Sequence, residues 1–180
     1  MNKYILFLII IITLFFSLSS QISAQENIQR DVDVDAEVVS GPLSIENPEN
    51  TLLDFGKMST PESGDAQVKV DASFNSIQSQ TPFHNGQYQL TEFTVSGPAE
   101  EEVVVILPDL VYVEHVDAAD YPNDNTDMSV DKFQTSLSEN RGSLDAEGDL
   151  SFRVGATLNV LSDQVPGKYE GTFEISVLYQ

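Results

Sequence analysis

The side chains best suited to chemistry in this chain are the oxygen donors crowded between residues 116 and 131. Four carboxylates recur at short intervals from residue 117 to residue 127, interspersed with asparagines: Asp117, Asp120, Asn123, Asp124, Asn125 and Asp127. Hard oxygen ligands at loop spacing suit Ca²⁺, although the segment lacks the glycine and the closing glutamate of an EF-hand loop. Aspartate and asparagine also form turns readily. A Ca²⁺ site and an ordinary acidic loop therefore both fit these residues, and no other cofactor is expected.

Catalytic constellations are sparse. His84 and His115 are the only side chains whose ordinary pKa lies near neutral pH, and neither belongs to a nucleophile motif. The chain has no cysteine, no G-x-S-x-G elbow and no glycine-rich phosphate loop. Its carboxylates are too abundant to single out a catalytic pair. We expect both histidines to be surface or edge residues, and we expect a protein that is not an enzyme.

Aromatic platforms for a carbohydrate are also few. The chain has no tryptophan, and most of its phenylalanines and tyrosines occupy alternating positions typical of a core. Tyr88, Tyr112 and Tyr121 remain as candidates. Packing at the rim of the fold is the other interpretation of these three residues.

The N-terminus has the pattern of a secretory signal peptide. Lys3 precedes an apolar run from Tyr4 to Phe16, which only Thr13 interrupts, and small residues lead to Ser23-Ala24. The run is shorter than the roughly 20 residues of a membrane-spanning helix. We predict a signal peptide at residues 1–24 and a single domain at residues 25–180. The protein would be exported through the Sec pathway to the periplasm, the cell surface or the medium, with no membrane span in its mature form.

The charge is strongly negative. The chain carries 29 acidic residues against eight basic ones, a formal net charge of −21 at pH 7. This balance argues against nucleic acid and anionic membranes as partners. Because no cysteine is available for disulfides, stability must come from burial of a core.

The elements that must carry these residues have the period of β-strands. Residues 150–160 and 169–179 alternate strictly between apolar or small and polar side chains, as half-buried strands do. Shorter strands are expected at residues 32–38, 43–45, 53–56, 68–74, 90–95, 102–107 and 110–113, and loops at 75–87, 116–131 and 140–148. The continuous apolar run at 103–106 predicts a central strand covered on both faces. Seven to nine short strands separated by Gly, Pro and Asn turns indicate an all-β sandwich.

The order of several short motifs carries a family resemblance. These motifs are Pro42-Leu43-Ser44-Ile45, Leu53-Asp54-Phe55-Gly56, Phe93-Thr94-Val95-Ser96-Gly97, Val105-Ile106-Leu107-Pro108, Val154-Gly155-Ala156-Thr157-Leu158, Gly167-Lys168-Tyr169-Glu170-Gly171-Thr172-Phe173 and Val177-Leu178-Tyr179. Together they resemble the bacterial family called domain of unknown function 4402. They are also similar, more distantly, to spore-coat-U and chaperone–usher pilin-type domains. The resemblance implies an exported, immunoglobulin-like, pilin-like antiparallel sandwich of two sheets with no established activity.

The pilin side of the resemblance implies a mode of assembly. Such subunits end in an alternating strand with an aromatic residue near the terminus, the place of Tyr179 here. Their N-terminal extension completes the sheet of a neighbouring subunit. Val32, Val34, Ala36 and Val38 fit that extension, and they equally fit a first strand of this domain itself. The implied partners are copies of this chain or other surface subunits.

Two functions follow as expectations. The first is a secreted or cell-surface structural or adhesive module without catalysis, in the form of a pilus-like subunit where strands are exchanged. The alternative is a soluble module that binds a glycan or Ca²⁺. The sequence names neither the ligand nor the oligomeric state.

Overall fold

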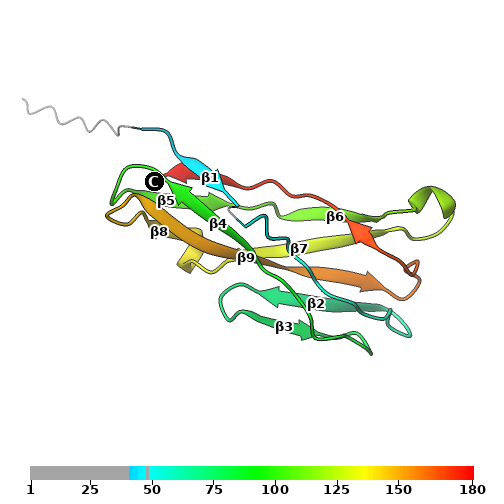
Figure 1. Cartoon of the computed structure of the whole chain (residues 1–180). Helices are drawn as coiled ribbons and strands as arrows, with labels where there is room; N and C mark the ends of the chain where they lie inside the picture. Colours follow the sequence, from blue (N-terminus) through cyan, green and yellow to red (C-terminus); the bar gives the residue numbers. More distant parts are fainter. Residues whose placement is uncertain (1–40, 48) are drawn as a thin grey trace, which may run out of the picture. The chain divides into compact units, whose positions relative to one another are not determined.

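The computed structural model of the protein describes residues 41–47 and 49–180. This part of the chain contains eleven strands and two one-turn 3₁₀ helices (Figure 1). In chain order they are β1 (Ser44–Glu46), β2 (Asp65–Asp71), β3 (Ser76–Ser79), β4 (Thr91–Ser96), β5 (Glu102–Ile106), β6 (Leu110–His115), η1 (Ala118–Asp120), β7 (Asp127–Thr135), η2 (Ser138–Asn140), β8 (Arg141–Ser143), β9 (Asp149–Leu161), β10 (Tyr169–Glu170) and β11 (Ser176–Tyr179). Over the same residues no helix has the length and apolarity needed to span a membrane.

The larger sheet has eight strands and is organised around β9, its longest member. One edge of β9 pairs first with β4 and then, further along, with β2, and the other edge pairs with β7. Beyond these neighbours lie β1 beside β4, β3 beside β2, and β6 and β10 beside β7. Gly155 stands where β4 gives way to β2, since a Cβ there would lie 2.2 Å from the carbonyl oxygen of Val70.

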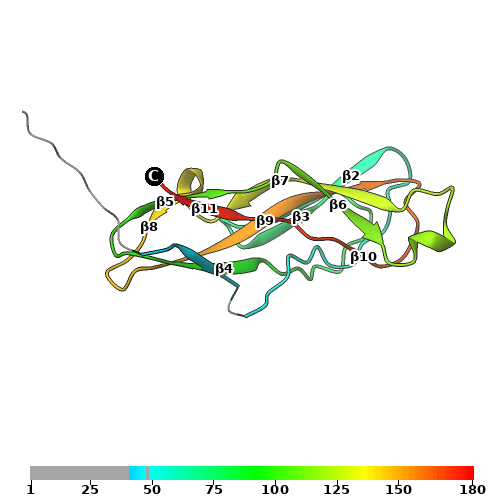
Figure 2. The same ribbon diagram turned by 90° about the horizontal axis from the view of Figure 1, so that it is seen from above.

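The smaller sheet has three strands in the order β11-β5-β8. Every strand pairing within the described residues is antiparallel. Seen from above, the smaller sheet lies over the end of the larger sheet that β1 and β4 form (Figure 2). The protein is therefore an all-β sandwich of two antiparallel sheets, as the sequence predicted.

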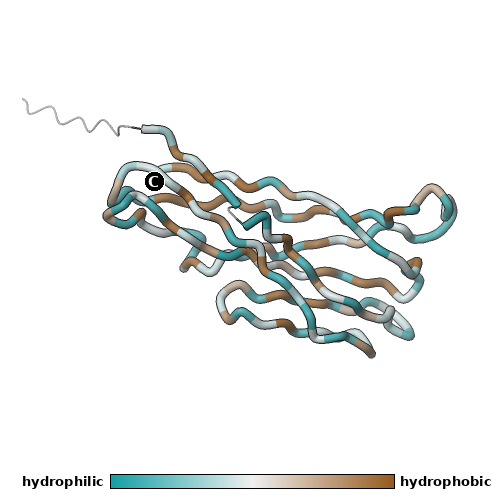
Figure 3. The backbone as a smooth tube through the Cα atoms, viewed as in Figure 1, coloured by the Kyte–Doolittle hydropathy of each residue, from teal (hydrophilic) through white to brown (hydrophobic). Residues whose placement is uncertain are grey.

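The core between the two sheets is built from alternating side chains. Val95, Val103, Phe152 and Val154 are buried together there. Hydrophobic and hydrophilic residues alternate along the strands, as the colouring of the backbone shows (Figure 3). A second core lies under β2, β6, β7 and the far half of β9, and its buried members are Val68, Met128, Val130, Ala156, Leu158 and Val160.

Over the second core the opposite layer is irregular. Leu53, Phe55 and Met58 pack against it from a segment with no regular strand. Backbone hydrogen bonds tie this segment to residues 83–89, through Asp54 to Gln89 (2.9 Å) and Ser59 to Phe83 (3.0 Å). The short strand predicted at 53–56 is wrong, because only one isolated bridge forms there.

The most informative difference from prediction concerns the last alternating segment, which we expected to be one strand. Its start, β10, pairs with β6 in the larger sheet, whereas its end, β11, pairs with β5 in the smaller sheet. The chain changes sheet between them while its alternation continues. The segment at 110–113 likewise belongs to the larger sheet, so it does not extend β5 beyond Pro108.

Other element boundaries also differ from those predicted. The polar segment 75–87 contains β3, the acidic segment ends where β7 begins at Asp127, and the turn region 140–148 contains β8. The apolar run of β5 is central in its sheet but covered on one face only: Val103 and Val105 are buried, whereas Ile106 is 47 % exposed. The described residues form eleven strands rather than the predicted seven to nine. Short strands such as β3 and β8 carry few apolar residues, so the sequence pattern did not indicate them.

Candidate functional site

At one side of the sandwich, β1 of the larger sheet approaches β11 of the smaller sheet. In the described chain β1 is paired only with β4, and β11 only with β5, so each strand has one free edge. The Tyr179 hydroxyl donates a hydrogen bond to the carbonyl oxygen of Gly41 (3.2 Å). That contact brings the last strand of one sheet against the start of the first strand of the other.

A row of half-buried apolar side chains follows β1, β11 and the segment that precedes β11. We call this row the seam: Leu43, Ile45, Phe173, Ile175, Val177 and Tyr179. All six pack against the core cluster that contains Val103 and Val154, which are themselves fully buried. The core is thus closed by the interior strands and only partly covered along the seam.

Free strand edges have a definite chemistry. Each presents a row of N–H and C=O groups that can pair with another extended chain. A strand laid along the seam would receive backbone hydrogen bonds from an edge, and its alternate side chains would meet the seam. The arrangement is suited to binding a strand rather than a small molecule.

Of the five residues predicted to serve in assembly, the structure describes Tyr179. Tyr179 lies in the seam, half-buried, as its alternation predicted. Val32, Val34, Ala36 and Val38 lie outside the described residues, so their part in the hypothesis remains a prediction.

The four carboxylates predicted to bind Ca²⁺ are all exposed and lie along one loop. Asp117 precedes η1, Asp120 ends it, Asp124 lies in a following turn, and Asp127 begins β7. Throughout the part of the chain that the structure describes, no three His, Cys, Asp or Glu side chains are grouped so as to hold a metal ion. The backbone bonds of Asp120 to Asp117 and of Asp124 to Tyr121 (3.0 and 3.1 Å) are those of successive turns. Ca²⁺ binding remains a prediction that the loop geometry does not favour.

His115 is buried, contrary to the expectation of a surface or edge residue. It is 4 % exposed, between the rings of Tyr121 and Tyr169 at centroid distances of 5.2 and 5.1 Å. Its Nδ1 accepts the N–H of Asp117 (3.0 Å), and its Nε2 lies 3.3 Å from the carbonyl oxygen of Pro166. Both ring nitrogens are therefore engaged with the backbone, where they stabilise the end of the fold.

His84 has an equivalent role. Its Nδ1 accepts the N–H of Gly86 (2.9 Å), and its Nε2 lies 2.7 Å from the carbonyl oxygen of Phe55. It joins the irregular layer to the segment that follows β3. Neither histidine has a free ring nitrogen for proton transfer in this arrangement.

Tyr169 closes the same end of the molecule. Its hydroxyl donates to the carbonyl oxygen of Val165 (2.6 Å) and accepts from the amide of Gln164 (3.0 Å). Burial, helped by the charge of Asp127, raises the pKa of the Tyr169 hydroxyl despite the hydrogen bond from Gln164. The tyrosine is a protonated structural anchor near neutral pH.

Sequence reasoning overlooked a polar surface on the outer face of the larger sheet. Glutamines and lysines alternate with core residues in β2 and β3, for example Gln67 and Lys69 around the buried Val68. The available signal was the choice of amides at outward positions of a chain otherwise dominated by carboxylates. The chemistry of that surface is developed below.

Fold and site together define an all-β sandwich module with an open apolar seam. Within that class the chain belongs to the family described as Domain of unknown function (DUF4402), whose profile matches residues 43–179. The match confirms the resemblance to this family, whereas the more distant likeness to spore-coat-U and pilin-type domains stays a prediction. No curated protein and no solved structure matches the chain.

Proposed function

We propose that the protein is an exported, non-catalytic structural or adhesive module that assembles by strand pairing at the seam. The observation that carries this proposal is the half-buried apolar row along two unpaired strand edges. Its export rests on the signal-peptide pattern of residues 1–24. Periplasm, cell surface and medium are all compatible destinations.

The N-terminal segment of a second copy is the strand we assign to the seam. Val32, Val34, Ala36 and Val38 recur with the two-residue period of a strand. Four apolar side chains on one face match a row of half-buried ones. Completing the burial of each seam residue would contribute about 1 kcal/mol to the free energy of association. Backbone hydrogen bonds would fix the register of the added strand.

Substitution in that segment tests the proposal. The mature chain from residue 25 should form oligomers that grow with concentration, as measured by light scattering, and filaments in electron micrographs. Val34→Asp places a charge on the apolar face, so we expect this variant to stay monomeric. Gln29→Asp adds the same charge outside the alternating segment and should behave as the parent. A parent chain that remains monomeric at high concentration would contradict the proposal.

Deletion of residues 25–40 separates exchange between copies from pairing within one chain. If the segment serves a neighbour, the deleted protein loses oligomers but unfolds at the same temperature as the parent monomer. If the segment is the first strand of its own domain, the deletion instead lowers the melting temperature or prevents folding.

A further inference from the structure

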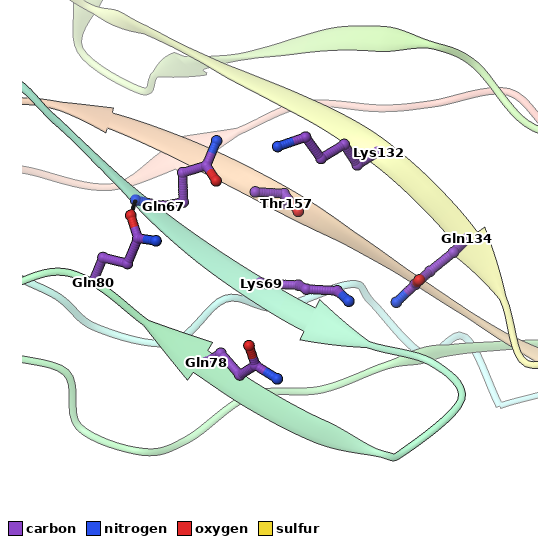
Figure 4. Close-up of a pocket in the computed structure, with 7 residues that line it drawn as sticks. All are labelled: Gln67, Lys69, Gln78, Gln80, Lys132, Gln134 and Thr157. Carbon is purple, nitrogen blue, oxygen red and sulfur yellow. Dashed lines mark hydrogen bonds between the residues drawn. The ribbon is translucent and has the colours of Figure 1, made fainter.

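The outer face of the larger sheet carries a shallow depression of about 340 Å³ with an unusual lining. Four glutamines surround it: Gln67, Gln78, Gln80 and Gln134. Lys69 and Lys132 complete the sides, and the buried Thr157 forms part of the floor (Figure 4). We call this surface the amide face. It shares no residue with the seam.

Strand register holds these side chains at regular spacing. Lys69 lies opposite Gln78 on β3 and opposite Thr157 on β9. The Gln67 amide donates to the side chain of Asn159 (2.8 Å), which fixes one corner. Neighbouring strands are about 4.8 Å apart, and successive outward residues about 6.7 Å apart along a strand. The amide face is therefore a preformed grid of hydrogen-bonding groups.

Lys132 owes its place to a β-bulge in β7. The pairing of β7 with β9 shifts between Asp131 and Gln134, and Lys132 has a left-handed backbone with φ of 51°. A residue with a side chain is strained in that conformation, which glycine adopts freely. Bulges re-aim side chains near functional sites. Here the bulge sends the lysine side chain across Thr157 toward Gln67 (Figure 4).

A polar atom beside Lys132 lacks a hydrogen-bond partner. Asp131 Oδ1 is shielded from solvent and makes no hydrogen bond within the described protein. A buried polar group left unsatisfied destabilises a fold. Strain and unmet hydrogen-bonding capacity therefore coincide at one bulge, a combination that favours a functional reason over a structural one.

The charge of the amide face also departs from that of the molecule. Two lysines line it, and the carboxylates of Asp71 and Asp131 adjoin them, so this face is balanced in charge within a chain of 29 acidic and eight basic residues. Lys69 is committed to the buried Asp71, with 2.7 Å between Nζ and Oδ2. Lys132 is exposed and makes no salt bridge to any residue in the described part of the chain. It is the ammonium group left for a ligand.

We propose that the amide face binds an acidic glycan, with the glutamine amides on sugar hydroxyls and Lys132 on a carboxylate. Amides both donate and accept, as hydroxyls do. A peptide is disfavoured because no apolar side chain lines the surface to anchor one. The net negative charge does not prevent binding, because at physiological ionic strength its field is screened beyond about 8 Å.

Titration of the mature chain with hexagalacturonate, followed by calorimetry, tests this inference. Binding should weaken as salt is raised, and cellohexaose, a neutral hexasaccharide, should bind at least tenfold less tightly. Lys132→Gln should weaken hexagalacturonate binding at least tenfold, and Gln78→Ala severalfold. Lys57→Gln removes an equally exposed lysine from the other layer and should change the affinity less than twofold.

Lys132→Gly separates binding from folding. Glycine relieves the left-handed backbone, so this variant should melt at or above the parent temperature while losing affinity. Four results would overturn the inference: no binding of hexagalacturonate at millimolar concentration, equal binding of cellohexaose, equal loss in Lys57→Gln, or comparable binding of a polyglutamate peptide. The test measures sugar affinity rather than oligomeric state, and the amide face lies outside the seam, so its outcome is distinguishable from that of assembly at the seam.

Discussion

The tightest local constraint on a single residue lies at Gly167, against the buried ring of His115. A Cβ on Gly167 would lie 1.9 Å from His115 Nε2. Gly167→Ala must displace the ring, and with it the hydrogen bond from Asp117, so we expect a loss of about 2–3 kcal/mol in the free energy of unfolding. Urea denaturation measures it.

Gly86→Ala is the control for the Gly167 substitution. Gly86 has a positive φ of 74° with no atom within 4 Å of an added Cβ. It should lose only about 1 kcal/mol, from backbone strain. Equal losses in the two variants would show that the contact with His115 is not what requires glycine at 167.

Asp71 should make the stability of the fold depend on pH, and the direction of this dependence follows from the shift of its pKa. Burial alone would raise its pKa, but hydrogen bonds from Lys69 and the Phe74 N–H, together with the charge of Lys69, hold its pKa below the usual 3.8. A carboxyl with a lowered folded-state pKa stabilises the fold fully above its unfolded pKa. That stability is lost as pH falls through the lower folded value.

We therefore expect Asp71→Asn to cost about 1–3 kcal/mol of unfolding free energy at pH 6. The difference from the parent should narrow below pH 3.8, as measured by urea denaturation at pH 6, 4.5 and 3. Asp124→Asn, at an exposed turn, is the matched control and should leave stability unchanged at pH 6. A constant difference for Asp71→Asn across this range would contradict the assigned role of its charge.

At the scale of elements, β9 and β11 compare a covered strand with an open one. Val154 in β9 is fully buried, whereas Val177 in β11 is half-buried along the seam. Val154→Ala should cost about 2–3 kcal/mol and Val177→Ala about 1 kcal/mol in the monomer, because the second residue loses less burial. Chemical denaturation of both variants measures the difference. Equal costs would mean that the seam is covered in solution.

Sequence patterning was accurate where one face of a strand is continuously buried. β9 was predicted almost to its ends, because its even-numbered residues stay apolar or small along the strand, where they pack on both cores in turn. The same rule failed at β10 and β11, since alternation continues unchanged when a strand leaves one sheet for another. β3 was missed because Ser76, Gln78 and Ser79 carry no apolar signal, and its hairpin is specified by the partner β2.

The candidate sites were less predictable than the strands. Tyr179 is half-buried where the alternation of its strand places it, and its role in assembly stays a prediction. The burial of His115 was missed, since two tyrosine rings and the loop before Tyr169 reach it only through the fold. The amide face depends on four strands, β2, β3, β7 and β9, and on the bulge in β7, and no local sequence pattern shows that these come together.

At the scale of the whole molecule, self-repulsion is the dominant electrostatic feature. A formal net charge of −21 destabilises a compact chain, and salt screens such repulsion. We expect the melting temperature to rise by several degrees between 10 mM and 500 mM NaCl. This rise sets the baseline for any effect of a divalent cation.

Calcium can then be tested against that baseline. Because Asp117, Asp120, Asp124 and Asp127 are exposed along the loop without forming a ligand cluster, 5 mM CaCl₂ should raise the melting temperature no more than NaCl or MgCl₂ at equal ionic strength. A specific site would add stability in proportion to the logarithm of free Ca²⁺ above its dissociation constant. An excess shift with Ca²⁺ that Asp120→Asn abolishes would overturn this expectation and restore the loop as a metal site. Differential scanning calorimetry in the three salts measures it.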